Sequence, residues 1–139
     1  MIVALDSEAL NALAGRDSPA KRRVRRALEA AIRTRSDVVV PTLVLAELYR
    51  GTGRSQLVDA LLARHEQAIN TRDTDRPLAR FVGAILHTGD AGSEHLVDAH
   101  VVAVAVEAGG GVVLTADTDD FAGLAAPYQS VLVEPLPSK

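Results

Sequence analysis

The sequence contains no cysteine among its 139 residues. It can therefore form neither a disulfide framework nor a thiolate metal site, and any metal ion must be held by oxygen atoms or histidine. The absence of thiols also fits a reducing compartment. The longest apolar run, around Val101 to Val106, ends at Glu107, far short of the ~20 residues that a membrane-spanning helix needs. We therefore expect no association with a membrane.

The sequence also has no excess of basic residues and few aromatic side chains. The formal net charge is -3, and the chain has two phenylalanines, two tyrosines and no tryptophan. The overall charge gives no signature of nucleic-acid binding, so any contact with RNA would depend on phosphates and shape rather than on base stacking. The apolar start from Met1 to Leu5 has no basic leader and is cut off by Asp6. We therefore predict a cytoplasmic protein without a signal peptide.

Short apolar segments alternate with helical patterns, and 47% of the residues are hydrophobic, enough to bury one core. We expect a single domain over residues 1–139. Strands that are apolar on both faces and alternate with helices indicate an α/β fold, a three-layer α/β/α sandwich around a central, mostly parallel sheet of about five strands. The segments expected to be strands are 1–5, 37–40, 68–70, 112–115 and 131–133. The segments expected to be helices are 7–14, 18–35, 42–50, 57–64, 77–86, 93–108 and 119–125.

Two of these helices are predicted in more detail. Ser93 is expected to be the N-cap of the helix at 93–108, which three glycines end. The apolar residues expected on the buried face of the helix at 18–35 are Val24, Leu28, Ala31 and Ile32. The basic residues that cover the rest of this segment are Lys21, Arg22, Arg23, Arg25, Arg26, Arg33 and Arg35.

Four acidic residues stand at positions that share one edge of the predicted sheet. Asp6 and Asp117 each follow a strand directly, and ligands bind beyond the carboxyl ends of the strands in such sheets. Glu47 and Asp98 lie in the first turns of helices that begin at the same edge. Because ionised carboxylates in apolar surroundings need a partner, an all-oxygen cluster without cysteine predicts one or two Mg²⁺ or Mn²⁺ ions.

Each acid also has a simpler interpretation. Asp6 and Asp117 are placed to cap helices, and Glu47 fits an exposed helix position. Glu94 and His95 are expected in a solvated first turn rather than in the site. The convergence of four acids on one edge favours a shared metal site over four unrelated roles.

The order of these acids resembles the PIN domain, especially the VapC-type ribonuclease toxins of bacterial toxin-antitoxin pairs. The resemblance covers nearly the whole chain, and its framing segments are IVALDSEAL, PTLVLAELYRG, VDAHVVAVAVEAG and LTADTDDF. It implies metal-dependent cleavage of RNA that leaves a 5′-phosphate and a 3′-hydroxyl. The metal-site acids it implies are Asp6, Glu47, Asp98 and Asp117, with Asp119 or Asp120 as a further candidate and with Ser7 or Thr115 as hydroxyl support.

The resemblance further implies a cognate antitoxin and a homodimer of the toxin. It leaves three interpretations of the basic segment: a solvated face, a contact with RNA phosphates, or part of the antitoxin-binding surface. One departure from the family is His100, where a small or aliphatic residue is more usual. Its role stays open.

Two other functions compete with this interpretation. A phosphoacceptor receiver domain is also α/β, but it needs an acid beside Asp6 and a lysine after a late strand, and the only lysines are Lys21 and Lys139. A binding module that keeps the fold without catalysis is the second alternative. A dehalogenase-like phosphatase fits less well, because Asp6 is followed by Ser7 and Glu8 rather than by the x-Asp of its opening motif.

Overall fold

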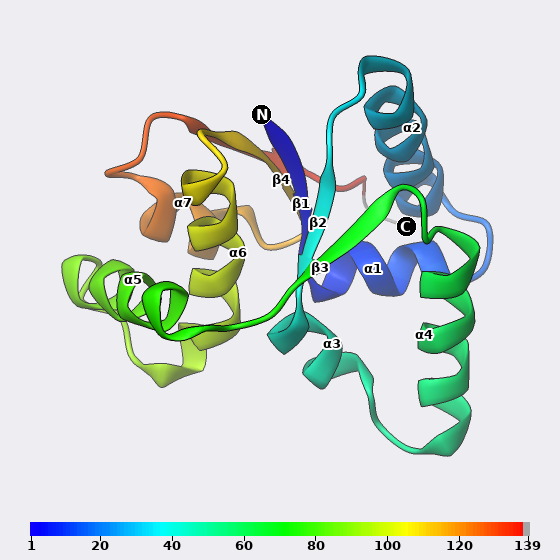
Figure 1. Ribbon diagram of the computed structural model, residues 1–139, viewed down its shortest axis with the longest axis horizontal. Helices are drawn as coiled ribbons and strands as arrows, with labels where there is room; N and C mark the ends of the chain where they lie inside the picture. The colour runs from blue at the N-terminus through cyan, green and yellow to red at the C-terminus, as the bar shows by residue number, and fades with distance from the viewer. Residues whose placement is uncertain (138–139) are drawn as a thin grey trace.

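The computed structural model describes residues 1–137, and its centre is a sheet of five parallel strands in the order β3-β2-β1-β4-β5 (Figure 1). The strands are β1 (Ile2–Leu5), β2 (Val38–Pro41), β3 (Ile69–Arg72), β4 (Gly111–Thr115) and β5 (Val131–Pro135). The predicted α/β fold is confirmed. Receiver domains have the strand order 2-1-3-4-5, so that alternative is wrong.

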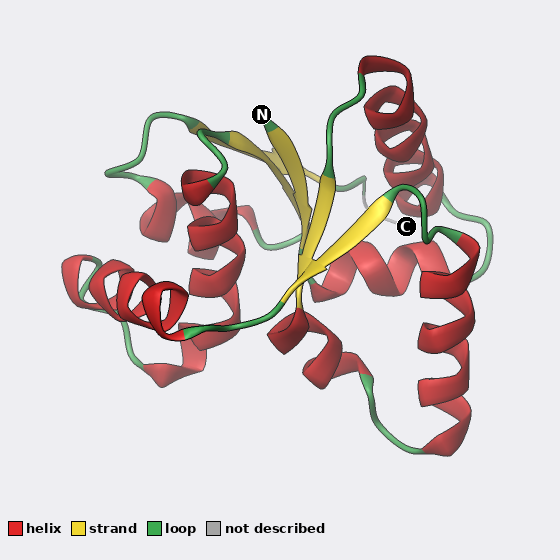
Figure 2. Ribbon diagram, viewed as in Figure 1, coloured by secondary structure: helices red, strands yellow, loops and turns green. Residues whose placement is uncertain are grey.

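Helices cover both faces of the sheet, which makes the three predicted layers (Figures 1 and 2). They are α1 (Ser7–Ala14), α2 (Pro19–Thr34), α3 (Thr42–Leu48), α4 (Thr52–Arg64), α5 (Arg76–Thr88), α6 (Leu96–Glu107) and α7 (Thr118–Ala125), with a 3₁₀ turn, η1 (Ser93–His95), before α6. α1 and α2 lie on one face, and α5, α6 and α7 on the other. None of the helices within residues 1–137 is long and apolar enough to cross a membrane.

The parallel register brings the ends of β1 and β4 together. Leu5 pairs with Leu114, so Asp6, directly after β1, lies at the same edge as Thr115, the last residue of β4. α6 returns from the opposite direction before β4, which places its first turn at this edge as well. β2 continues into α3 without a loop. The carboxyl edge therefore gathers the start of α1, α3, α6 and α7.

α6 is the central helix of its layer and is buried nearly all round. Every residue from Ala99 to Ala105 is buried, because the helix packs on β1, β2, β4 and β5 and is covered by α5 and α7. It ends in a turn where Gly109 and Gly110 have φ of +86° and +124°, a region that residues with a Cβ rarely adopt. The buried length of α6 fixes the position of Asp98 in its first turn.

The predicted buried face of α2 is wrong at one position. Val24, Leu28 and Ala31 are buried, but Ile32 is 63% exposed. Because successive residues turn by roughly 100° around a helix, Ile32 stands about 90° from the centre of a stripe that Ala27 completes. The buried face of α2 therefore includes Ala27 and excludes Ile32.

The predicted N-cap at Ser93 is also wrong. Ser93 is the first residue of η1, and its side chain makes no capping hydrogen bond. The His95 N–H donates to the Gly92 carbonyl at 3.1 Å, which closes a tighter turn before α6 starts at Leu96. This turn carries His95 to the carboxyl edge of the sheet.

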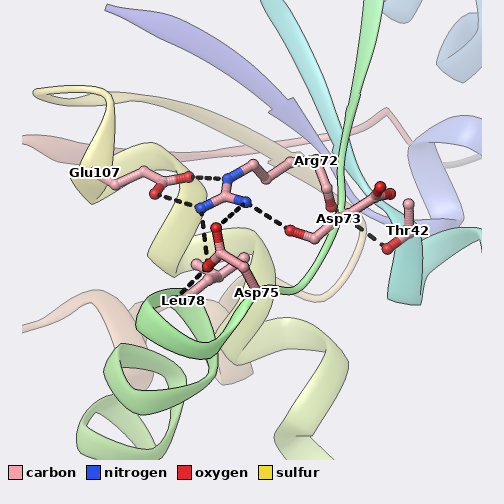
Figure 3. A network of polar contacts seen from close by, with 6 residues as sticks. All are labelled: Thr42, Arg72, Asp73, Asp75, Leu78 and Glu107. Atoms are coloured by element: carbon pink, nitrogen blue, oxygen red, sulfur yellow. Dashed lines mark hydrogen bonds and ion pairs between the residues drawn. The ribbon is translucent and has the colours of Figure 1, made fainter.

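A network around Arg72 joins the end of β3 to two helices (Figure 3). The guanidinium donates to both carboxylate oxygens of Glu107, at 2.8 and 3.2 Å, and to those of Asp75, at 3.1 and 3.4 Å. Asp75 also caps α5 by accepting the Leu78 N–H at 2.9 Å. The Arg72 side chain thus connects the edge strand to the end of α6 and the start of α5.

Candidate metal centre

Asp6 is a helix cap that is almost completely buried. It is 3% exposed, and its Oδ1 accepts the Ala9 N–H at 2.8 Å at the start of α1. Burial raises the pKa of its carboxyl to about 6, although the Thr115 hydroxyl and the Ala9 N–H offset part of that rise. The capping interpretation is therefore correct, and the burial leaves the ionised carboxylate short of compensating charge.

Asp98 is the third residue of α6 and is half-buried. The pKa of its carboxyl is raised to about 6, mainly by burial and then by the charges of Asp6, Glu47 and Asp117, in that order of size. The interaction between two charged groups weakens with distance. Three acids from separate segments of the chain, Asp6, Glu47 and Asp117, therefore lie near Asp98.

Asp117 precedes α7, but its side chain does not cap that helix. Instead its backbone N–H donates to the Thr115 hydroxyl at 2.9 Å, which fixes the turn after β4. A hydrogen bond with Asp120 is the main cause that raises the pKa of the Asp117 carboxyl, followed by burial and the charge of Asp120. The two carboxylates are both exposed and lie close together, so a cation bound between them would offset their repulsion.

Glu47 lies on the exposed side of the cluster, near the end of α3. It borders a hollow with Ser7 and Glu8 from the first turn of α1 and Arg54 from α4. The pKa of the Glu8 carboxyl is raised by burial and then by the charges of Asp117 and Glu47. Ser7 and Glu47 thus lie on one side of the acid cluster, and Glu8 is a fifth acid beside it.

His95 joins the cluster next to Asp98 and Asp120. One ligand atom each of His95, Asp98 and Asp120 lies within 4.8 Å of the others. Asp119 borders the same hollow as His95 and Asp120, but it does not belong to this group of three. Of the two adjacent candidates, the structure therefore brings Asp120 rather than Asp119 to Asp98.

A model of the PIN domain family matches residues 3–127 of this chain. The chain belongs to the PIN domain family. PIN domains form a family of nucleases, and they typically use divalent metal ions. Comparison with curated proteins finds no match.

The PIN domain also resembles a chain in the crystal structure of VapBC2 from Rickettsia felis bound to a DNA fragment from their promoter. The TM-score is 0.66 at 15% sequence identity, and the match covers 99% of this chain and 100% of that chain. At this identity the likeness shows a shared fold.

The donor set of the PIN domain suits a divalent ion. It offers carboxylate oxygens and one imidazole, and the sequence has no thiolate. Two ligands bonded to one ion at ~2.1 Å lie at most about 4.2 Å apart, so a group within 4.8 Å needs only small side-chain movements to close on an ion. The raised pKa values of Asp6 and Asp98 show where a cation would supply the missing charge.

Sequence reasoning missed two residues of this cluster. Glu8 carries the same signal as Glu47, because it lies in the first turn of a helix that starts at the carboxyl edge. His95 was expected to be solvated, yet it is half-buried and its charge lowers the pKa of both Asp98 and Asp117. The three-residue spacing from His95 to Asp98 was a usable signal, since residues at that spacing share a helix face.

Proposed function

We propose that this PIN domain is a divalent-metal-dependent endoribonuclease and the toxin of a toxin-antitoxin pair. The observation that carries the proposal is the electrostatic state of Asp98, whose carboxyl has a pKa raised to about 6 by burial and by Asp6, Glu47 and Asp117. A nuclease fold with uncompensated acids at the carboxyl edge of its sheet fits metal-assisted hydrolysis of a phosphodiester bond. RNA as the substrate and Mg²⁺ or Mn²⁺ as the ion follow the resemblance of the sequence to VapC-type toxins.

The residues divide by their surroundings. Asp6, Asp98 and Asp117 are assigned to hold the ion, because they share the edge at which α1, α6 and α7 begin. A divalent ion there would supply positive charge that polarises the scissile phosphate and favours attack by water at neutral pH. Thr115 positions two of these acids, since its hydroxyl accepts the Asp117 N–H and also hydrogen-bonds to Asp6.

The exposed side of the cluster is assigned to water and RNA. Glu47 and Glu8 line an open hollow there together with Ser7, and side chains in that position reach solvent rather than the interior. Arg54 lies on the rim of the same hollow, where its guanidinium donates to Asn11. A cation at the rim of an acidic site fits a contact with an RNA phosphate beside the scissile one.

The basic face of α2 offers less free positive charge for RNA binding than its number of arginines suggests. Arg22 pairs with Asp17 at 2.9 Å, and Arg23 pairs with Glu134 at 2.5 Å. These pairs neutralise part of the charge that would attract RNA. The remaining arginines fit either a solvated face or a contact with RNA phosphates, which salt dependence of binding distinguishes.

The antitoxin and a homodimer belong to the same proposal. The chain that shares this fold belongs to VapBC2, in a structure bound to a DNA fragment from their promoter. That likeness supports an antitoxin as a partner of this PIN domain. This chain also leaves apolar side chains in solvent, among them Leu57 on α4, which is 60% exposed. An apolar hollow beside it is lined by Leu10, Leu48 and Leu61, and apolar surface of that kind marks contacts between proteins.

Cleavage of total cellular RNA tests the enzymatic part. We expect cleavage with Mn²⁺ or Mg²⁺, none with EDTA, and a loss of at least 100-fold in Asp98→Asn, in line with the removal of one metal ligand. Glu29→Gln is the matched control, because Glu29 is an exposed acid on α2 away from the carboxyl edge. Cleavage that Asp98→Asn leaves intact, or that survives EDTA, would refute the proposal. Metal binding without cleavage of any RNA would favour the non-catalytic binding module.

A further inference from the structure

His95 is the one nitrogen donor in the group of three that lies within 4.8 Å, together with Asp98 and Asp120. It is the last residue of η1 and comes three residues before Asp98, so the 3₁₀ turn and the first turn of α6 carry both side chains. Asp120 arrives from the first turn of α7. Three elements thus bring one imidazole and two carboxylates to one point.

We propose that His95 is a metal ligand of this PIN domain, in a position that it shares with Asp98 and Asp120 and that favours a divalent transition-metal ion over Mg²⁺. The inference rests on the proposed function only for the presence of a divalent ion. Mg²⁺ is a hard ion that takes oxygen ligands and dehydrates reluctantly. An imidazole adds affinity for first-row transition metals, which exceeds any gain for Mg²⁺.

Asp98 is common to this position and to the acid cluster of Asp6 and Asp117. A carboxylate with two oxygens can serve both positions, as acids do in sites that hold two ions. The hydrogen bond between Asp117 and Asp120 places the second carboxylate of the His95 position against the first cluster. His95 and Asp120 therefore extend the acid cluster rather than form a separate site.

A purely electrostatic role is the competing explanation for His95. Its imidazole lies 3.8 Å from the Glu94 carboxylate, measured from Nε2 to Oε1. As an imidazolium it would only neutralise nearby acids, whereas a metal ligand must be the neutral imidazole. The two roles respond differently to lysine, which keeps a positive charge near the acids but does not bind metal while it is protonated.

Pulsed electron paramagnetic resonance of bound Mn²⁺ separates the two roles, because a directly coordinated imidazole gives a ¹⁴N modulation. We expect the modulation in the wild-type protein and its loss in both His95→Gln and His95→Lys. Mn²⁺ affinity should fall about 10-fold or more in both variants, at least as much as the loss of a residue that only supports a metal ligand, while Mg²⁺ affinity changes less than about 2-fold. His87→Gln is the matched control, since His87 is an exposed histidine on α5.

His100 is the other histidine near Asp98, and the variants separate it from His95. Its Nδ1 is bound to the Leu96 carbonyl at 2.8 Å. A modulation that persists in His95→Gln overturns the inference, and so does its absence from the wild-type protein with bound Mn²⁺. Full Mn²⁺ affinity in His95→Lys overturns it as well. Metal-dependent RNA cleavage without a ¹⁴N modulation would refute this inference alone, whereas a modulation without cleavage would refute the proposed function alone.

Discussion

Asp6 and Asp98 lie close enough at the carboxyl edge of the sheet for the charge of Asp6 to raise the pKa of the Asp98 carboxyl. One side chain follows β1 and the other belongs to the first turn of α6, so 91 residues of chain separate them. Both carboxyl groups have a pKa of about 6, and burial is the largest cause for each. Holding two ionised acids together at neutral pH therefore lowers the stability of the folded state. A cation bound to them would offset this loss.

The first prediction concerns Asp6 and pH. The carboxyl of Asp6 has a pKa of about 6 in the folded protein, against the usual value of 3.8 for an aspartic acid in water. The folded state therefore binds the proton more tightly, and stability increases as the pH falls from about 6 towards 4 and is lost as the pH rises through that window. Asp6→Asn should raise the free energy of unfolding of the metal-free protein at pH 7.5 by about 2 to 3 kcal/mol, because asparagine also caps helices.

Urea unfolding in EDTA measures this effect. The advantage of Asp6→Asn should shrink as the pH falls from about 6 and vanish below about pH 3, where the aspartic acid of the wild type is mostly neutral in both states. Asp17→Asn is the control, since Asp17 is an exposed acid on a surface ion pair. A variant Asp6→Asn that is less stable than wild type at pH 7.5 would contradict the assigned electrostatic penalty.

The second prediction concerns the network around Arg72. Its guanidinium bonds both oxygens of Glu107 and both of Asp75. Arg72→Lys keeps the charge but cannot form the paired bonds, so we expect a loss of about 1 kcal/mol in the free energy of unfolding. The control is Arg80→Lys, at an exposed position on α5. Equal stability of the two variants would show that the paired hydrogen bonds of Arg72 add no more to stability than an isolated surface charge does.

The third prediction concerns His100. Its Nδ1 donates to the Leu96 carbonyl, and its Nε2 is buried with no partner among residues 1–137. A buried acceptor without a partner costs stability, whereas an apolar side chain of similar size does not. His100→Leu should therefore be as stable as wild type or up to about 1 kcal/mol more stable, with unchanged Mn²⁺ affinity. A clear loss of Mn²⁺ affinity would instead assign His100 to the metal site.

Much of the fold and the main acids could be predicted from the sequence. Asp6 and Asp117 follow short apolar strands, and the rule for parallel sheets then places both at one edge. Asp98 and Glu47 follow from the direction of the helices between parallel strands. These inferences needed only the alternation of strands and helices, which the sequence shows by its apolar periodicity.

The remaining features depend on details that apolar periodicity does not encode. Whether Asp119 or Asp120 reaches the site depends on where α7 begins, and its start at Thr118 puts Asp120 three residues after Asp117 on the same face. His95 lies in the 3₁₀ turn η1 directly before α6, whereas the prediction placed it in the first turn of a helix capped by Ser93. The observed start of α7 differs from the predicted one by one residue, and that of α6 by three.

The position of a bound ion tests the shared metal site most directly. Crystals grown with Mn²⁺ at pH 7.5 allow the ion to be located by its anomalous scattering. We predict a peak at a bonding distance, on the order of 2 Å, from carboxylate oxygens of Asp6 and Asp98, and its loss in crystals of Asp98→Asn. A peak coordinated only by residues elsewhere, or no peak at a Mn²⁺ concentration that supports RNA cleavage, would contradict the assignment of the acid cluster.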